Sequence, residues 1–314
     1  MPRIWTIGEL LVEIMRPTTG VPLNEPGYFR GPFPSGAPAI FIDCAARLGL
    51  DTGIIGAVGN DDFGRCLTER LEKDGVDISH VTVSDKVSTG CAFVTYFEDG
   101  SRKFIFHIGN AACGEIYAPE DGCEVGAEYL HICGCSLSAS PTMGTEILKT
   151  ARKFISAGAK ISFDPNIRPE LLRDDSSKSV IAEVLANTSV LLPGVGELLM
   201  LTDSETVDEA LEKVFKNDRL EVVAIKDGKR GCRIISRSED FTMGIYPIEV
   251  LDSTGAGDCF DAAMVSGLCE GRPLRECAQR ATAASAWGIN GFGPMEGDIS
   301  PENVEKLIRE NEDK

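Results

Sequence analysis

The sequence lacks any long apolar run and any excess of basic charge. No stretch approaches the roughly 20 consecutive apolar residues that a membrane-spanning helix needs. Acidic residues number 49 against 31 lysines and arginines, which gives a formal net charge of −18. A surface this acidic repels the phosphates of nucleic acids and of anionic membranes, so we expect neither as a partner.

Zinc and disulfide patterns are also missing. The 3 histidines are scattered and no Cys-x-x-Cys occurs, which argues against a zinc site. The odd number of cysteines, 11, favours a reducing compartment over a disulfide framework. The N-terminal MPRIWTIGELLVEIM has neither the basic region nor the cleavage site of an export signal. We therefore expect a cytoplasmic protein whose cysteines are mostly small core residues.

Two common nucleotide-binding motifs are absent as well. There is no Gly-x-x-x-x-Gly-Lys-Ser/Thr phosphate loop, and no Gly-x-Gly-x-x-Gly follows the first apolar run. The second absence weakens the hypothesis of a hydride-transfer enzyme with a dinucleotide fold.

What the sequence does contain is an alternation of apolar and amphipathic segments. Short apolar runs predict buried strands at residues 4–7, 54–58, 129–133, 160–163, 189–192 and 222–225. Helical spacing lies between them, as in Phe63, Leu67 and Leu71. Strands that alternate with helices predict an α/β fold with a mostly parallel sheet covered on both faces.

Two regions break this alternation. Residues 10–33 are rich in proline and glycine, and residues 90–108 predict two strands around the turn Glu98-Asp99-Gly100. A hairpin in an otherwise α/β chain predicts a small β flap beside the main sheet. Such a flap can cover a ligand and exclude water, or it can form a dimer surface.

The strongest site signal is Asp252–Phe260, DSTGAGDCF. It follows a strand-like segment at 245–251 and opens an apolar helical run at 262–268. Glycines let the backbone approach a ligand, and the amides of Gly255–Gly257 at a helix N-terminus favour an anion. Asp258 lies beside that anion site and can accept a proton from an attacking hydroxyl. Amides and a base together suit phosphoryl transfer, and the alternative is a plain glycine-rich turn with a capping aspartate.

Asp252–Phe260 resembles the C-terminal signature of the PfkB, or ribokinase-like, carbohydrate kinases. The N-terminal half agrees, because a predicted helix over residues 35–49 precedes the segment IGAVGNDDFG at 55–64, which resembles the family's first signature. The resemblance spans the chain and is closest in character to fructokinase, 2-keto-3-deoxygluconate kinase and tagatose kinase members. It implies a ribokinase-like three-layer sandwich, with residues 1–314 as a single kinase domain and lid segments at about 10–35 and 88–112.

The resemblance also implies an ATP-dependent sugar kinase that uses ATP and Mg²⁺, with a monovalent cation as a further candidate and a homodimer through the lid as a candidate assembly. Its implied catalytic residues are the base Asp258, the anion-hole residues Gly255, Ala256 and Gly257, and Arg168. Its implied nucleotide-binding residues are Glu197, Lys226, Gly228, Gly231, Thr254, Gly255, Gly257 and Asn290. Glu197 fills the glutamate position of the family's Asn-x-x-Glu motif, in which Gly194 replaces the asparagine. This glutamate is expected to hold Mg²⁺ through water.

The implied sugar-binding residues are Glu13, Gly36, Ala37, His107, Asn110, Arg168 and Asp258. A carboxylate at Glu13 suits paired hydroxyls, because it can accept from two at once. In 2-keto-3-deoxygluconate kinases a lid arginine binds the carboxylate of the sugar acid, whereas the comparable stretch here offers His107. A neutral imidazole binds a carboxylate less well than a guanidinium does. We therefore favour a neutral ketose, such as fructose or tagatose, over the sugar acid.

Three alternatives stay open. A nucleoside kinase of the same fold would act on adenosine or inosine, because residues that bind sugar hydroxyls can also bind a ribose. A nucleotide-binding or sugar-binding sensor would bind its ligand without turnover. A hydride-transfer enzyme, the most distant alternative, would bind NAD.

Overall fold

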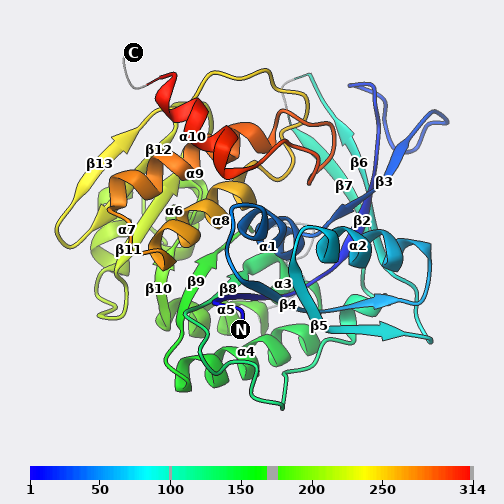
Figure 1. The fold of residues 1–314 in the computed structure, drawn as a ribbon, viewed down its shortest axis with the longest axis horizontal. Helices are drawn as coiled ribbons and strands as arrows, with labels where there is room; N and C mark the ends of the chain where they lie inside the picture. Colours follow the sequence, from blue (N-terminus) through cyan, green and yellow to red (C-terminus); the bar gives the residue numbers. More distant parts are fainter. Residues whose placement is uncertain (99–100, 168–175, 312–314) are drawn as a thin grey trace.

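The computed structural model describes residues 1–98, 101–167 and 176–311. Its main sheet has the order β13-β12-β11-β10-β9-β8-β1-β4-β5 (Figure 1). All strand pairs from β5 through β11 are parallel, whereas β12 and β13 add antiparallel strands at one edge. The strands are β1 (Ile4–Ile7), β4 (Thr52–Gly59), β5 (Val76–Ser84), β8 (Tyr129–Cys133), β9 (Lys160–Asp164), β10 (Thr188–Leu191), β11 (Val222–Lys226), β12 (Cys232–Ser236) and β13 (Asp240–Met243). The predicted mostly parallel sheet is therefore confirmed.

Helices cover both faces of this sheet. Adjacent strand residues point to opposite faces, so Ile54 packs into one core and Ile55 into the other. The first core includes residues from α1 (Ala37–Arg47), α2 (Asp62–Lys73), α8 (Ala256–Cys269), α9 (Leu274–Gly288) and α10 (Pro301–Arg309). The second includes residues from α3 (Gly134–Ala139), α4 (Pro141–Ser156), α5 (Ser176–Ala186), α6 (Val195–Thr202) and α7 (Val207–Val214). Short 3₁₀ turns lie at η1 (Ala112–Gly114) and η2 (Gly228–Arg230).

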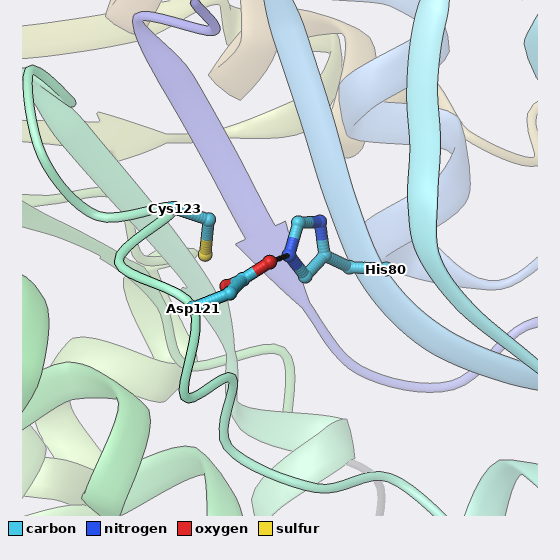
Figure 2. Close-up of side chains that lie close together, drawn as sticks. All are labelled: His80, Asp121 and Cys123. Atoms are coloured by element: carbon cyan, nitrogen blue, oxygen red, sulfur yellow. Dashed lines mark hydrogen bonds and ion pairs between the residues drawn. The ribbon is translucent and has the colours of Figure 1, made fainter.

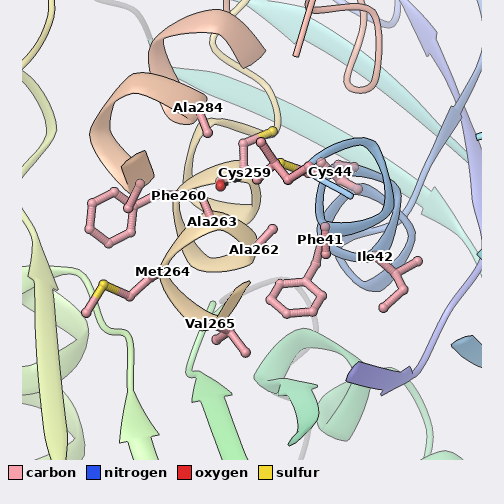
Figure 3. Packing of buried hydrophobic residues seen from close by; sticks show 14 of the residues in the cluster. Phe41, Ile42, Cys44, Cys259, Phe260, Ala262, Ala263, Met264, Val265 and Ala284 are labelled. Atoms are coloured by element: carbon pink, nitrogen blue, oxygen red, sulfur yellow. Dashed lines mark hydrogen bonds between the residues drawn. The ribbon is translucent and has the colours of Figure 1, made fainter. Parts of the chain in front are cut away.

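Helix α8 is the centre of the first core, where it packs against α1 and α9 (Figure 3). Its buried Ala262 and Ala263 and the buried Ala284 of α9 carry small side chains, which let the helices approach closely. The Cys44 thiol of α1 also donates to the carbonyl of Cys259, at 3.7 Å. This packing fixes the position of the glycine-rich turn at the N-terminus of α8.

A smaller sheet has the order β3-β2-β6-β7 and lies to one side of the main sheet (Figure 1). Its strands are β2 (Leu11–Met15), β3 (Arg30–Ser35), β6 (Gly90–Tyr96) and β7 (Arg102–His107). The predicted hairpin is confirmed, although Asp99 and Gly100 of its turn lie outside the described residues. Strand β2 pairs in parallel with β6, so the two segments that interrupt the α/β alternation form one sheet.

The predicted strand at 245–251 is wrong. Strand β13 ends at Met243, and residues 244–250 form an irregular segment in which Ile245 and Val250 are 54% and 58% exposed. These apolar side chains line a cavity instead of packing in the sheet. Elsewhere, all 11 cysteines are free thiols. Among the described residues, no helix combines the length and apolar character needed to cross a membrane.

Candidate active site

A cavity of about 240 Å³ lies at the carboxyl ends of the parallel strands, between the main sheet, the smaller sheet and α8. Glu9 follows β1, Asp164 ends β9 and Lys226 ends β11, and all three line it. Open α/β sheets generally bind ligands at this edge. The cavity brings together most of the residues predicted from the sequence: Glu13, Gly36, Ala37, Glu197, Lys226, Thr254, Gly255, Ala256, Gly257 and Asp258.

The glycine-rich turn ends in the first turn of α8. Gly255 caps this helix with a φ of 82°, and a Cβ at this position would lie 2.7 Å from the carbonyl oxygen of Pro294. The amides of the first helical turn have no acceptor within the helix and carry the positive end of the helix dipole. Ala256 and Gly257, which carry two of these amides, line the cavity, and the partly exposed Asp258 follows them. The amides of this first turn and the carboxylate of Asp258 therefore belong to one continuous segment of the cavity lining.

A hydrogen-bond network ties this turn to the smaller sheet. Asp252 Oδ1 accepts from the Thr254 amide at 2.9 Å and from the Tyr96 hydroxyl at 2.9 Å. Arg102 Nη1 donates to Thr254 Oγ1 at 3.0 Å. Burial, and next the Asp252 carboxylate, raise the pKa of Tyr96, so its hydroxyl keeps the proton that it donates. The smaller sheet is therefore held directly against the turn.

Glu13 supplies a buried carboxyl to the same cavity. Its Oε1 accepts from Ser35 Oγ at 2.7 Å, whereas the buried Oε2 has no hydrogen-bond partner among the described residues. Burial raises the pKa of Glu13 to about 7, against the lowering effect of the hydrogen bond from Ser35. The negative charge of Asp252 acts in the same direction as burial. A ligand hydroxyl at Oε2 would give this oxygen the partner that it lacks.

Lys226 joins two buried carboxylates. Its Nζ lies 2.8 Å from Asp261 Oδ2 and 3.1 Å from Asp164 Oδ2. Burial disfavours the ammonium charge, but the two carboxylates outweigh this effect and raise the pKa of Lys226. The ammonium is therefore charged and fixed at the end of β11.

Glu197 caps the helix α6. Its Oε2 accepts from the Gly194 amide at 2.7 Å, and its Oε1 accepts from the Ile167 amide at 2.9 Å. The carboxylate thus holds together the segments that follow β9 and β10. Each oxygen keeps a lone pair for a further donor or a metal-bound water.

A second cavity, of about 460 Å³, adjoins the first. Both are lined by Lys226, Ser253, Ala256 and Gly257. The rest of the second cavity is mainly apolar, with Ile245, Tyr246, Pro247, Ile248, Val250, Phe260, Ala286 and Ile289. It suits a flat, largely apolar group whose charged end points toward α8.

The predicted nucleotide-binding residues divide between the two cavities. Gly228 and Gly231 line the second cavity. Thr254 lines only the first, and its hydroxyl is bound by the smaller sheet. Asn290 lines neither, because its side-chain amide donates to the carbonyl of Glu249 at 3.0 Å.

The structure does not bring His107 and Asn110 to the first cavity. Both line a separate, more open hollow of about 880 Å³ beside α2. For His107 the reason is strand alternation, because β7 turns Arg102, Phe104 and Phe106 toward the first cavity, whereas Asn110 lies beyond the end of this strand. Arg102, which lines the first cavity, was not among the residues predicted from the sequence. The predicted Arg168 lies outside the described residues.

Glu9 was also missed. It is 5% exposed, and its carboxylate accepts from Cys135 Sγ at 3.0 Å and from the Ser136 hydroxyl. The available signal was its position directly after the first parallel strand, where side chains face the ligand edge of the sheet.

Comparison with known proteins places the chain in a family. A model of the pfkB family carbohydrate kinases matches residues 1–300. Fructokinase of Salmonella typhimurium is 30% identical over 269 residues, which cover 85% of this chain and 84% of that protein. An E. coli protein provisionally named Ribokinase II, solved with ATP and Mg²⁺, is 40% identical with a TM-score of 0.93, covering 99% of this chain and 100% of that one. Fructokinase from Vibrio cholerae O395, solved with fructose, ADP and calcium ion, shares the fold at 22% identity, with a TM-score of 0.84 and coverage of 98% and 99%. The chain therefore belongs to the pfkB family of carbohydrate kinases, ATP-dependent phosphotransferases that act on sugar hydroxyls.

Proposed function

We propose that this protein transfers the γ-phosphoryl group of ATP to a hydroxyl of a neutral ketose such as fructose or tagatose. One observation carries the proposal: the first turn of α8 lies where the two cavities join. Ala256 and Gly257 line both cavities, and Asp258 lines the smaller one. A sugar in the smaller cavity and a nucleotide in the larger one would therefore meet at one base and one set of amides.

In the proposed reaction Asp258 accepts the proton of the attacking sugar hydroxyl. The bond from that oxygen to the γ-phosphorus forms as the bond to the leaving ADP oxygen breaks. The amides of Gly255–Gly257 donate to the phosphoryl oxygens, where negative charge develops. Lys226, fixed by its two carboxylates, lies at the junction of the cavities and adds positive charge beside the phosphates.

The residues present fit Mg²⁺. Asp164, Glu197 and Asp258 line the cavity and offer the carboxylate oxygens that this ion prefers. Bound Mg²⁺ would neutralise charge on the transferring phosphates. Because both Glu197 oxygens already accept from backbone amides, we propose that Glu197 acts through water. A monovalent cation is a further candidate, since Vibrio cholerae fructokinase was also solved with potassium ion.

A neutral sugar is supported by the charge of the smaller cavity. Glu9, Glu13 and Asp258 surround it with carboxyl groups, which accept hydrogen bonds from hydroxyls and repel an anion. The curated relatives in other organisms are named fructokinase. The buried Glu13 Oε2 is the proposed acceptor for a sugar hydroxyl.

A second candidate substrate is a 2-keto-3-deoxy sugar acid, because Arg102 lines the smaller cavity. Among the described residues, Arg102 donates only through Nη1, to Thr254, so its other N–H groups could bind a carboxylate. His107, which the sequence offers in place of a lid arginine, lies away from this cavity and so does not favour either substrate. The choice between the two substrates now depends on Arg102.

The experiment is a coupled assay of ADP release with ATP and Mg²⁺, across ketoses, aldoses, 2-keto-3-deoxy sugar acids and nucleosides, in potassium and in sodium buffer. The expected result is turnover with one neutral ketose. The variant Arg102→Gln should change the KM for this ketose only a few-fold. Turnover with the sugar acid alone would establish the second candidate, provided that Arg102→Gln mainly raises the KM for the sugar acid. ATP binding without turnover on any acceptor would contradict the proposal.

We further propose that residues 1–314 act as one kinase domain in which the smaller sheet serves as a lid over the sugar. Phe97 and Ile105, 37% and 42% exposed, support a homodimer through this sheet. A cytoplasmic location is proposed from the free thiols. Sedimentation of the purified chain tests the dimer.

A further inference from the structure

A cluster of three metal-ligating side chains lies apart from both cavities. His80 stands on the edge strand β5, and Asp121 and Cys123 lie in the segment between η1 and β8. His80 Nε2 is 2.9 Å from Asp121 Oδ2, and one ligand atom from each of the three residues lies within 4.8 Å of the others. Figure 2 shows the imidazole nitrogen and the Cys123 sulfur both close to the Asp121 carboxylate. The sequence spreads these residues over more than forty positions, and the fold brings them together.

The surroundings hold the cluster in place. The His80 ring packs edge-on against Trp5, with ring centroids 5.2 Å apart. His80 Nδ1 lies 2.9 Å from Ser79 Oγ. A metal at Nε2 would take the place of the proton that Nε2 shares with Asp121 Oδ2, while Nδ1–H donates to Ser79 Oγ, the arrangement found around metal-binding histidines.

Three carboxylates, those of Asp121, Glu124 and Asp77, act on the Cys123 thiol, against the single positive charge of Lys153. Their excess negative charge makes the surroundings of the thiol attractive to a cation.

We propose that His80, Asp121 and Cys123 bind one Zn²⁺ ion, with water as the fourth ligand. Zinc takes nitrogen, oxygen and sulfur ligands at about 2.0–2.3 Å, which places the donor atoms of a tetrahedral site roughly 3.3–3.6 Å apart. The three ligand atoms lie within 4.8 Å of one another, so side-chain shifts of about one ångström complete the geometry. The thiol releases its proton to solvent on binding.

This zinc would join the edge of the main sheet to the segment before β8. Strand β5 has β4 as its only partner in the described sheet, so its other side depends on such contacts. The site is independent of the phosphotransfer residues, because none of its three ligands lines either ligand cavity. Its expected effect is on stability more than on turnover.

The test uses the full chain, stripped with a chelator and saturated with ATP and Mg²⁺, and titrated with Co²⁺ as a spectroscopic probe and then with Zn²⁺. The expected result is one equivalent of Co²⁺ with a sulfur-to-cobalt charge-transfer band, displaced by Zn²⁺, and a Tm that Zn²⁺ raises. His80→Ala and Cys123→Ser should lose the band and the Tm response, whereas the control Cys66→Ser should keep both.

A second control separates this site from the catalytic centre, where Cys133, Asp164 and Asp258 also lie close together. Asp258→Asn should leave the cobalt band unchanged. Nucleotide binding by each variant shows that it is folded. A band that persists in folded His80→Ala and Cys123→Ser, a band lost in Asp258→Asn, or the absence of any thiolate band would overturn the proposal.

Discussion

The two cavities meet at the first turn of α8, but the rest of their linings are chemically different. The smaller one has acceptors and donors aimed from several strand ends and from the smaller sheet, among them Glu13, Arg102 and Asp258. The larger one is bounded mainly by apolar side chains of an irregular segment and of α9. A sugar is distinguished by the directions of its hydroxyls, so its site needs fixed polar groups. A purine is distinguished by its shape, for which apolar walls suffice.

The largest effect is expected at the junction. Asp258→Asn should lower kcat about 10²- to 10⁴-fold, because the variant cannot take the hydroxyl proton, and it should leave the Kd of ATP nearly unchanged. Steady-state kinetics and calorimetry measure the two quantities. The control is Asp218→Asn, whose parent carboxylate is fully exposed, at 102%. A kcat within a few-fold of the native value would remove Asp258 as the base.

This contrast also explains how much the sequence could predict. Gly255 to Asp258 were predicted because a contiguous turn and helix start carry the whole signal. The contact between Lys226 and Asp261 was not, since it joins a strand end to a helix thirty-five residues later. The sequence does not show which face of β7 points toward the cavity, because Ile105 on the outer face is as apolar as its neighbours Phe104 and Phe106.

One wall of the larger cavity was missed for a related reason. Residues 245–251 are apolar enough to be taken for a buried strand, and nothing local shows that they lack a ladder partner. A binding wall for an apolar ligand and a core strand have the same composition, so only the tertiary structure distinguishes them.

The next effect concerns Lys226, the one charged side chain that lines both cavities in the described part of the chain. Lys226→Met leaves the buried Asp164 and Asp261 without their shared cation, which should cost about 3–5 kcal/mol of unfolding free energy. Urea unfolding at neutral pH measures it. Adding Asp261→Asn should restore part of the loss, and the exposed neighbour Lys229, changed to Met, should cost almost nothing. If Lys226→Met and Lys229→Met lost the same unfolding free energy, the buried ion pairs of Lys226 would not stabilise the fold.

The pH dependence of sugar binding tests the role of Glu13 in the smaller cavity. The Glu13 pKa of about 7 means that the carboxylate, the better acceptor, is half formed at about pH 7 and predominates above it. Sugar affinity should therefore fall as the pH drops below about 7, by at most tenfold per unit. Calorimetric titration with sugar across this range measures it. Glu13→Gln should bind more weakly at high pH and show no such dependence, whereas the exposed Glu72→Gln should behave like the native protein.

The same carboxyl should have the opposite effect on stability. Burial raises its pKa from 4.5 to about 7, so the folded state favours the protonated form. The resulting stabilisation is complete below the unfolded pKa and is lost as the pH rises through the folded one. Glu13→Gln, which cannot ionise, should therefore lose less stability than the native chain as the pH rises from 4.5 to about 7. A parallel pH dependence in both proteins would assign the effect to another group.

The smallest effect is expected in the apolar cavity. Val250 is 58% exposed and lines the larger cavity, so a bound nucleotide would cover a side chain that contributes little to the fold. Val250→Ala removes two methyl-sized groups and should raise the KM for ATP by up to roughly tenfold, without changing the KM for sugar or the Tm. Val125→Ala, at 60% exposure in the parent chain and away from both cavities, is the matched control. If Val250→Ala and Glu13→Gln each altered both KM values, the cavities would act as one site. Effects confined to ATP and to sugar respectively would mean that the chain recognises its two substrates separately and joins them only at α8.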